Sequence, residues 1–480
     1  MSSASARWPR VASLRTPAGL RTRLAELDLE LPCDDLVDPT GPLAAPLDLG
    51  GVRAPNRFAI QPMEGWDGTP DGRPTPLTER RWRRFGASGA GWLWGGEAVA
   101  VRPEGRANPN QLVMGDGSAK AIGALRRAAL ASAAESGAPA PVVGLQLTHS
   151  GRWSVPERGN RRPRVAYRHP LLDARSGVAG DDAVLGDAEL GQLVRDFASA
   201  ARLAAEEGFD FVDVKHCHGY LLHELLSART RGGRYGGETL AARSRFALEV
   251  VAAVRDAAPG LRIGVRLSVF DAVPHQRVEG ERGPEAAPLP HPRPYPFAFG
   301  ADPSEPTRLD LAEPIAFARA LQRAGVTWWN VTAASPYYAP HLQRPALFPP
   351  SDGYPPPEDP LVGVARLLGA ARELKRALPG AVVVSSGWSY LQDFVPHVAQ
   401  PCLAAGWFDA VGLGRMALSY PDLPRDVLAG RPLERRRVCR TFSDCTSAPR
   451  AGLVSGCYPL DAFYRERPEH AQLEARKRAS

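Results

Sequence analysis

Short runs of apolar, β-branched and aromatic residues recur along the chain, and Gly or Pro bounds most of them. Between the runs, apolar residues recur at the three- and four-residue spacing of amphipathic helices. Runs of this length between turn residues predict buried strands. Eight strands are predicted, at Arg57–Met63, Gly91–Val99, Pro141–Thr148, Phe209–Lys215, Arg262–Ser268, Thr327–Thr332, Ala381–Ser386 and Phe408–Gly414. Helices are predicted at Ala119–Glu135, Leu190–Glu207, Ala241–Ala258, Leu311–Ala324, Leu361–Leu378 and Leu391–Ala405.

Strands that alternate with helices indicate an α/β protein with a parallel sheet covered by helices. Eight repeats are the number that closes a (β/α)8 TIM barrel, which is therefore the expected fold. A doubly wound open sheet is the alternative. Such a sheet normally carries a Gly-rich phosphate turn after its first strand, whereas Arg57–Met63 is followed by GWDGTPDG, which is not GxGxxG.

The eight repeats also divide the chain. Residues 1–45 are expected to form an irregular N-terminal extension, 46–430 the barrel, and 431–480 a basic, Cys-containing C-terminal arm. Between the fifth strand and its helix lies Asp271–Pro306, which is dense in Pro, Gly, Glu and Arg. A long loop at this position leaves the barrel at the end where active sites lie, so we predict a lid on the substrate side.

Composition narrows the class of protein. The 480 residues are 44% hydrophobic and 23% charged, which excludes a mainly disordered or fibrous chain. No run of about 18 apolar residues occurs, so no membrane span is expected. The net charge is +7, but the basic residues alternate with Asp and Glu, which favours a solvated surface over a nucleic-acid interface. Six Cys make no disulfide framework in a chain this long, and this favours a reducing, cytoplasmic location.

The predicted fourth strand carries the most informative chemistry. Its alternation places Asp213 and Lys215 on one face, at the end where a barrel keeps catalytic residues. His218 and Tyr220 follow directly. Ammonium, imidazole and phenol groups donate hydrogen bonds, so together they could hold a substrate oxygen and deliver a proton. The same residues are also compatible with a structural Lys–Asp ion pair inside the barrel.

A zinc site formed by His216, Cys217 and His218 is not expected. Consecutive residues on an extended strand cannot converge on one tetrahedral ion. The sequence therefore predicts no metal site.

Six segments in order resemble the old yellow enzyme family of FMN-dependent ene-reductases. They are NRFAIQPM, GGEAVAVRPEGRANPNQ, LQLTHSGR, HGYLLHELLS with the following RYGG and RSRF, VVSSGW and VGLGR. The resemblance covers roughly residues 50–430. It implies a TIM barrel that binds FMN and takes electrons from NADH or NADPH.

The resemblance also implies roles for individual residues. Tyr220 matches the proton donor, and His218 matches one of two residues that grip the substrate oxygen. The expected cofactor-binding residues are Pro62, Met63 and Ala98 along the flavin, Gln146 at its pyrimidine edge, Arg243 near N1 and O2, and Gly387, Gly414 and Arg415 at the phosphate.

Two positions depart from the family pattern. Lys215 stands where the second gripping residue is usually His, in a chain with only four Lys. Glu64 stands where a Thr or Cys normally touches flavin O4, and a carboxylate there should make flavin reduction harder.

The C-terminal arm resembles that of larger relatives such as 2,4-dienoyl-CoA reductase, which carry a [4Fe–4S] cluster on four Cys. Here only Cys439, Cys445 and Cys457 are present, so we expect an arm that packs or oligomerises without a cluster. A possible homo-oligomer is compatible with this arm.

The leading hypothesis is an NAD(P)H-dependent reductase of an activated C=C bond in an α,β-unsaturated carbonyl or related small molecule. In it Lys215 and His218 polarise the activating oxygen and Tyr220 protonates the α-carbon. One alternative keeps the flavin but oxidises or isomerises a pathway intermediate without net NAD(P)H use. Another is a catalytically inactive barrel that acts as a binding subunit.

Overall fold

The sheet at the centre of the molecule is a closed, parallel ring. The computed structural model describes residues 7–281 and 283–479. Strand β4 pairs with both β3 and β6, which closes the ring, and β5 pairs with β6 further along. The barrel strands are β3 (Phe58–Ile60), β4 (Trp92–Leu93), β5 (Ala98–Ala100), β6 (Val142–Thr148), β7 (Phe211–Val214), β8 (Arg262–Ser268), β11 (Trp328–Thr332), β12 (Val382–Ser385) and β13 (Ala410–Leu413). The predicted TIM barrel is therefore confirmed.

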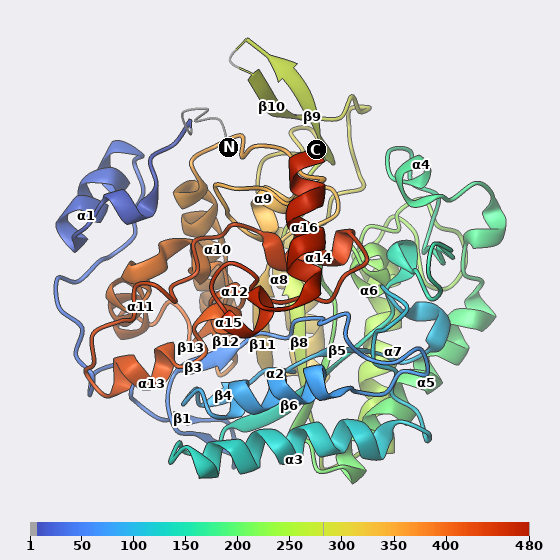
Figure 1. Cartoon of the computed structure of the whole chain (residues 1–480). Coiled ribbons are helices and arrows are strands. Elements are labelled where there is room, and N and C mark those ends of the chain that lie inside the picture. Colours follow the sequence, from blue (N-terminus) through green and yellow to red (C-terminus); the bar gives the residue numbers. More distant parts are fainter. Residues whose placement is uncertain (1–6, 282, 480) are drawn as a thin grey trace.

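Helices surround this ring on the outside (Figure 1). The main ones are α2 (Pro76–Gly86), α3 (Ala119–Glu135), α5 (Asp187–Glu206), α7 (Leu240–Ala257), α8 (Ala312–Arg323), α10 (Pro360–Ala377) and α11 (Val395–Ala404). Helix α5 shows why they form: Leu190, Leu193, Val194 and Phe197 are buried and follow a helical period. Short helices are α4 (Asp173–Ser176), α6 (Leu221–Leu225), α9 (Pro340–Gln343), α12 (Arg415–Ser419) and α13 (Leu423–Leu428).

The second predicted strand, Gly91–Val99, is interrupted and forms β4 and β5. Gly95 and Gly96 lie at the break, and Gly96 adopts a positive φ of 52°. A Cβ added to Gly96 would lie 2.4 Å from the buried ring of Trp82. The backbone therefore turns where it passes close to this ring, and a glycine permits both the turn and the close approach.

Aromatic rings fill the end of the barrel where the strands begin. Trp92 lies 5.0 Å from Trp94, 5.7 Å from Phe211 and 5.1 Å from Trp328 between ring centroids. The small hairpin of β1 (Leu47–Asp48) and β2 (Arg53–Ala54) contributes Leu47 and Ala54 to the same cluster. This end of the barrel is closed and apolar.

The N-terminal extension contains helix α1 (Pro17–Glu26), begun by Thr16, whose side chain accepts from the Gly19 amide. Arg23 on α1 pairs with Asp359 at 2.8 Å, and Asp359 also caps α10. The expectation of an irregular extension is therefore corrected in this part of the segment.

The C-terminal arm folds back over the other end of the barrel, where it is drawn in red in Figure 1. It contains α14 (Asp444–Arg450), α15 (Ala462–Arg465) and α16 (Pro468–Ala479). Lys477 Nζ on α16 donates a hydrogen bond to Asp444 Oδ2 at the start of α14, at 2.8 Å. Within the described residues, no helix combines the length and the hydropathy needed to cross a membrane.

Candidate active site

A cavity of about 1250 Å³ opens at the carboxyl ends of the barrel strands. Its wall is formed by residues that follow β3, β7, β12 and β13 and by residues 445–455 of the C-terminal arm. This is the end of a TIM barrel at which catalytic groups are found.

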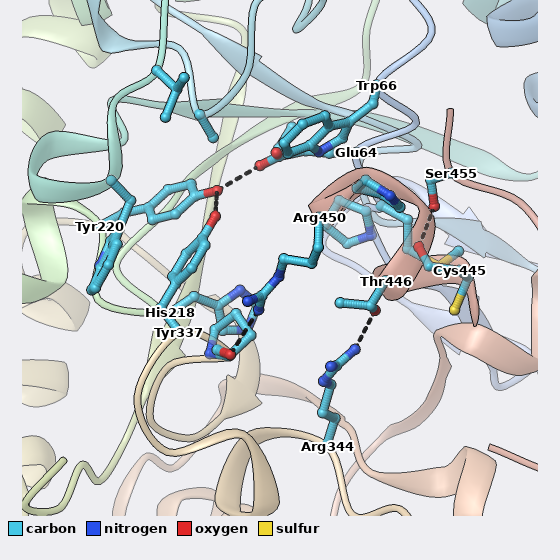
Figure 2. Close-up of a pocket in the computed structure, with 18 of the residues that line it drawn as sticks. Glu64, Trp66, His218, Tyr220, Tyr337, Arg344, Cys445, Thr446, Arg450 and Ser455 are labelled. Carbon is cyan, nitrogen blue, oxygen red and sulfur yellow. Dashed lines mark hydrogen bonds between the residues drawn. The ribbon is translucent and has the colours of Figure 1, made fainter. Parts of the chain in front are cut away.

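Tyr220 lines this cavity beside Glu64 and Tyr337 (Figure 2). Its hydroxyl donates to Glu64 Oε1 at 3.0 Å and lies 3.2 Å from the hydroxyl of Tyr337. Burial, followed by the charge of Glu64, raises the pKa of Tyr220 well above its usual value. The phenol therefore keeps its proton at neutral pH and can donate it to a substrate.

Lys215 completes this cluster. Its Nζ lies 3.6 Å from Glu64 Oε1 and 3.9 Å from the centroid of the Tyr220 ring. The two departures from the family pattern thus face each other and pair, and the Lys–Asp pair considered from the sequence does not form. The Asp213 carboxylate instead accepts three hydrogen bonds. The donors are Gln146 Nε2 at 2.6 Å, Trp94 Nε1 at 2.7 Å and the Arg266 amide at 2.6 Å.

His218 faces the same cavity from the loop after β7. Its Nε2 lies 3.4 Å from Thr332 Oγ1 and 3.3 Å from Gln343 Nε2. Burial and then the charges of Arg266 and Lys215 lower the pKa of His218 well below its usual value. The imidazole is therefore neutral at pH 7 and can offer one N–H to a ligand.

A buried ion cluster holds the loop that presents Glu64. Arg81 on α2 pairs with both Asp67 and Glu97, and Glu97 Oε1 accepts from the Gly65 amide at 3.0 Å. Burial raises the pKa of Glu97, and the charge of Arg81 opposes this rise. Since removal of the guanidinium would leave carboxylates buried without a counter-charge, this cluster orders the loop strongly.

Seven of the expected cofactor-binding residues do line the cavity. They are Pro62, Met63, Glu64, Ala98, Gly387, Gly414 and Arg415. Gln146 is not on the cavity wall, because its amide group points to Asp213.

The expectation for Arg243 needs correction. Arg243 lies on α7, where it donates to the Leu226 carbonyl and pairs with Glu313 at 2.6 Å, away from the cavity. Arg266 from β8 lines the cavity instead, and its Nε is buried without a hydrogen-bond partner in the described part of the chain. An Arg near the end of the predicted strand Arg262–Ser268 was the available signal. Arg266, and not Arg243, therefore offers a guanidinium group to the cavity.

The structure also differs from the prediction of a lid. Asp271–Pro306 contains an antiparallel hairpin of β9 (His275–Gly280) and β10 (Gly283–Pro288) that extends away from the barrel (Figure 1). None of its described residues lines the cavity. The segment packs beside the barrel through contacts such as Tyr338 Oη to Asp271 Oδ2, at 2.5 Å. The expectation of a lid is therefore wrong for this conformation, and the C-terminal arm covers the cavity instead.

Two guanidinium groups show where an anion fits. Arg415 follows β13 and Arg344 follows α9, and both line the cavity. Within the described residues, Arg415 Nη1 and Arg344 Nη2 are buried without hydrogen-bond partners. A Cβ added to the neighbouring Gly414 would meet nothing within 4 Å, so there is open space beside them. These donors fit the phosphate of FMN, and Arg344 is a candidate ligand that the sequence did not indicate.

The cysteines of the arm lie close to the cavity. Cys445 lines it, and all six cysteines are free thiols. Across residues 7–281 and 283–479, no group of three or more His, Cys, Asp or Glu side chains is arranged to hold a metal ion.

The fold and the site together define a (β/α)8 barrel with a cation-lined cavity at the carboxyl ends of its strands. Residues 42–287 match the family described as "NADH:flavin oxidoreductase / NADH oxidase family". The chain belongs to this family, to which the old yellow enzymes also belong.

Curated relatives show the same likeness. The chain is 27% identical over 449 residues to the "Metal reductase" of Desulforamulus reducens, covering 90% of this chain and 53% of that protein. It is 27% identical over 249 residues to "Putative 12-oxophytodienoate reductase 11" of Oryza sativa subsp. japonica, covering 52% of each. The chain thus spans about half the length of these curated relatives.

Solved structures support the fold. The 2-naphthoyl-CoA reductase complex aligns with a TM-score of 0.65 at 16% identity, covering 88% of this chain and 57% of that chain. Morphinone reductase aligns with a TM-score of 0.55 at 21% identity, covering 82% and 91%. At these identities the likeness establishes the barrel and not the substrate.

Proposed function

We propose that this protein reduces the activated C=C bond of an α,β-unsaturated carbonyl or related small molecule at the expense of NAD(P)H. The observation that carries the proposal is the Tyr220 phenol, which keeps its proton and lies in the cavity between Glu64 and Tyr337. Relatives named 12-oxophytodienoate reductase support a small-molecule substrate.

Lys215 and His218 bind the activating oxygen of the substrate. Both side chains line the cavity on the same side as Tyr220, since all three come from the end of β7 and the loop after it. FMN, held at its phosphate by Arg344 and Arg415, would supply the hydride equivalent from NAD(P)H that the β-carbon receives. Negative charge then grows on the oxygen, and the ammonium group and the imidazole N–H stabilise it.

Tyr220 delivers the proton to the α-carbon. Its hydroxyl proton is the one hydrogen-bonded to Glu64, and the Tyr337 hydroxyl at 3.2 Å can return a proton afterwards. The reduction thus adds one hydride to the β-carbon and one proton to the α-carbon of the C=C bond. The stacking of Tyr337 on Trp153, with 4.5 Å between ring centroids, keeps this second hydroxyl in place.

The hydrogen bond between Tyr220 and Glu64 also favours a second candidate function. Because Glu64 accepts the hydrogen bond from Tyr220, the two groups could also remove a substrate proton, as an oxidation or isomerisation requires. Net consumption of NAD(P)H with an enone supports reduction. Turnover without NAD(P)H supports the second candidate, and the absence of any turnover by the FMN-loaded protein supports a binding subunit.

The decisive experiment separates the two half-reactions of Tyr220→Phe by stopped-flow absorbance. Flavin reduction by NAD(P)H should keep its rate, whereas reoxidation by the enone should slow by roughly 10²–10⁴-fold, the usual contribution of a positioned acid. Tyr337→Phe is the matched control, because it removes one hydroxyl of the same cluster and should slow reoxidation much less. Equal slowing of both half-reactions by Tyr220→Phe would contradict the role of proton donor.

A further inference from the structure

Positive charge dominates the wall of the cavity. Among the described residues that line it, eight are Arg or Lys and three are Asp or Glu, a surplus of five positive charges. A phosphate carries close to two negative charges at neutral pH, so FMN compensates only part of the surplus. Charges concentrated on one wall of a cleft attract ligands of the opposite sign.

The inner cations have partners or a cofactor to bind. Arg344 and Arg415 fit the flavin phosphate, Arg266 fits the flavin ring, and Lys215 faces Glu64. Arg106 donates to the carbonyls of Pro70, Pro103, Pro109 and Pro156 and thereby fixes the loop that begins at Pro156. Three further arginines of the wall form an outer group, Arg158 and Arg161 on that loop and Arg450 on α14.

Arg450 connects this outer group to the proton donor. Its guanidinium carbon lies 5.4 Å from the centroid of the Tyr337 ring, and the hydroxyl of that ring touches Tyr220. Figure 2 shows Arg450 reaching from the C-terminal arm toward Tyr337. Arg450 also donates to the Pro336 carbonyl at 3.1 Å and pairs with Asp352, whose side chain is 48% exposed.

Arg161 lines the same cavity from the loop that begins at Pro156. Its positive charge acts on both Arg450 and Tyr337, and it adds to burial in lowering the pKa of Arg450. Two guanidinium groups that line one cavity and repel each other are stabilised by an anion between them. Planar guanidinium groups match carboxylates and phosphates in geometry as well as in charge.

We propose that Arg450 and Arg161, with Arg158 beside them, bind a carboxylate or phosphate group of the substrate whose C=C bond lies over Tyr220. This inference rests on the proposed function and deepens it, because it makes the substrate an anionic unsaturated carbonyl compound. It also gives the C-terminal arm a role in substrate selection, since Arg450 belongs to the arm.

The test compares an acid with its neutral ester. The probes are a cyclohexenone that carries a propanoate side chain at C3, its methyl ester, and the saturated forms of both. Binding of the saturated pair to the FMN-loaded full chain is measured by calorimetry, which needs no turnover. We expect the acid to bind about tenfold more tightly than the ester, as for a partly buried charge-assisted contact.

Substitutions of the arginines test whether these residues cause the tighter binding of the acid. Arg161→Gln, at an exposed position, and Arg450→Gln should each weaken binding of the acid about tenfold and leave the ester unchanged. Arg450→Lys should keep part of the preference, because it keeps the charge. Arg162→Gln is the matched control, since Arg162 lies on the same loop, pairs with Glu157 and does not line the cavity; it should change neither affinity.

The outcomes separate this inference from the proposed function. Equal binding of acid and ester, or equal weakening of both by the variants, overturns the anion site even if the neutral enone is reduced. If the variants change the dissociation constant for NADPH and not for the acid, the anion is a coenzyme phosphate and the assignment to the substrate is wrong. Preferential binding of the acid without reduction of either enone supports the site and contradicts the reductase.

Discussion

The two ends of the barrel are built from the same strands, but one is closed and aromatic and the other is open and lined by cations. Strand β7 contributes Phe211 to the aromatic cluster at one end, and Lys215 follows it at the cavity, four residues further on. At the first end Trp92, Trp94 and Trp328 pack without an opening, whereas at the second end cations line a cavity of about 1250 Å³. Position along a strand, and not only the face of the strand, therefore decides whether a side chain serves stability or chemistry.

The difference has a physical basis in burial. Aromatic rings at the closed end gain free energy from leaving water and carry few polar groups that need partners. At the open end each buried charge requires a counter-charge or a ligand. Asp213 lies at the boundary, where burial raises its pKa to about 6 while three donors hold its carboxylate.

The largest effect is expected at the closed end. Trp92→Ala removes a fully buried ring that contacts three other aromatic residues, and should lower the free energy of unfolding by about 4 kcal/mol. Urea unfolding measures this loss, and the flavin spectrum of the folded variant should stay that of the wild type. Trp407→Ala is the control, because Trp407 is only half-buried and packs against Arg372. An equally small loss in both variants would contradict the role of the aromatic cluster.

At the open end, Glu64 and Lys215 should depend on each other. Either Lys215→Met or Glu64→Gln leaves one group of a largely buried pair without its partner, while the double variant removes both. We expect a coupling of about 2 kcal/mol between them in the free energy of unfolding. The exposed pair Arg202 and Glu206 on α5 serves as control and should couple by about 0.4 kcal/mol. A coupling for Glu64 and Lys215 as small as that of the control would show that the two groups do not interact.

The next prediction separates two arginines that the sequence alone confused. Arg266→Met should weaken FMN binding by the apoprotein about tenfold, because it removes a cation from the cavity wall. Arg243→Met should leave FMN affinity unchanged and instead lower stability, because Arg243 pairs with Glu313 between α7 and α8. Titration of FMN fluorescence measures the affinities. The opposite result would restore the original expectation for Arg243.

The smallest effect concerns pH. Burial and the nearby charge of Arg152 lower the pKa of His169, in the loops at the open end, to about 3. The unfolded chain takes up a proton below pH 6.5 that the folded protein does not, so this residue contributes a loss of stability as pH falls from 6.5 toward 3.

His169→Asn tests this contribution. Asn can still accept the amide hydrogen bonds that His169 Nδ1 now accepts from Leu171 and Leu172, but it does not titrate. Between pH 6 and 5 the variant should lose less stability than the wild type, by about 1.2 kcal/mol. Parallel pH profiles of the two proteins in urea unfolding would show that His169 is not buried in its neutral form.

Much of the barrel was predictable because its signals are local. The run Pro141–Thr148 corresponds to β6 (Val142–Thr148), and Arg262–Ser268 has the bounds of β8. Tyr220, His218 and Lys215 were found because they directly follow one strand, and the end of a barrel strand is where side chains enter the cavity. The hairpin within Asp271–Pro306 was missed, since its composition resembles a loop.

Other parts of the site had no local signal. Tyr337 touches Tyr220 from a loop after β11, and Arg450 reaches the cavity from the C-terminal arm. Arg344 is placed by its contact with Thr446, which is again a residue of the arm. These contacts join residues that are about a hundred or more positions apart, and nothing in the spacing of either segment indicates them.

The amino-acid sequence by itself determined the repeating strands and helices, the (β/α)8 closure and the chemistry that follows β7, because each depends on patterns within a few residues. Only the tertiary structure decided that Lys215 pairs with Glu64, that Arg266 rather than Arg243 faces the cavity, and that the arm supplies Arg450. The physical reason is that electrostatic pairing and burial depend on distances in space, which are settled when the whole chain packs.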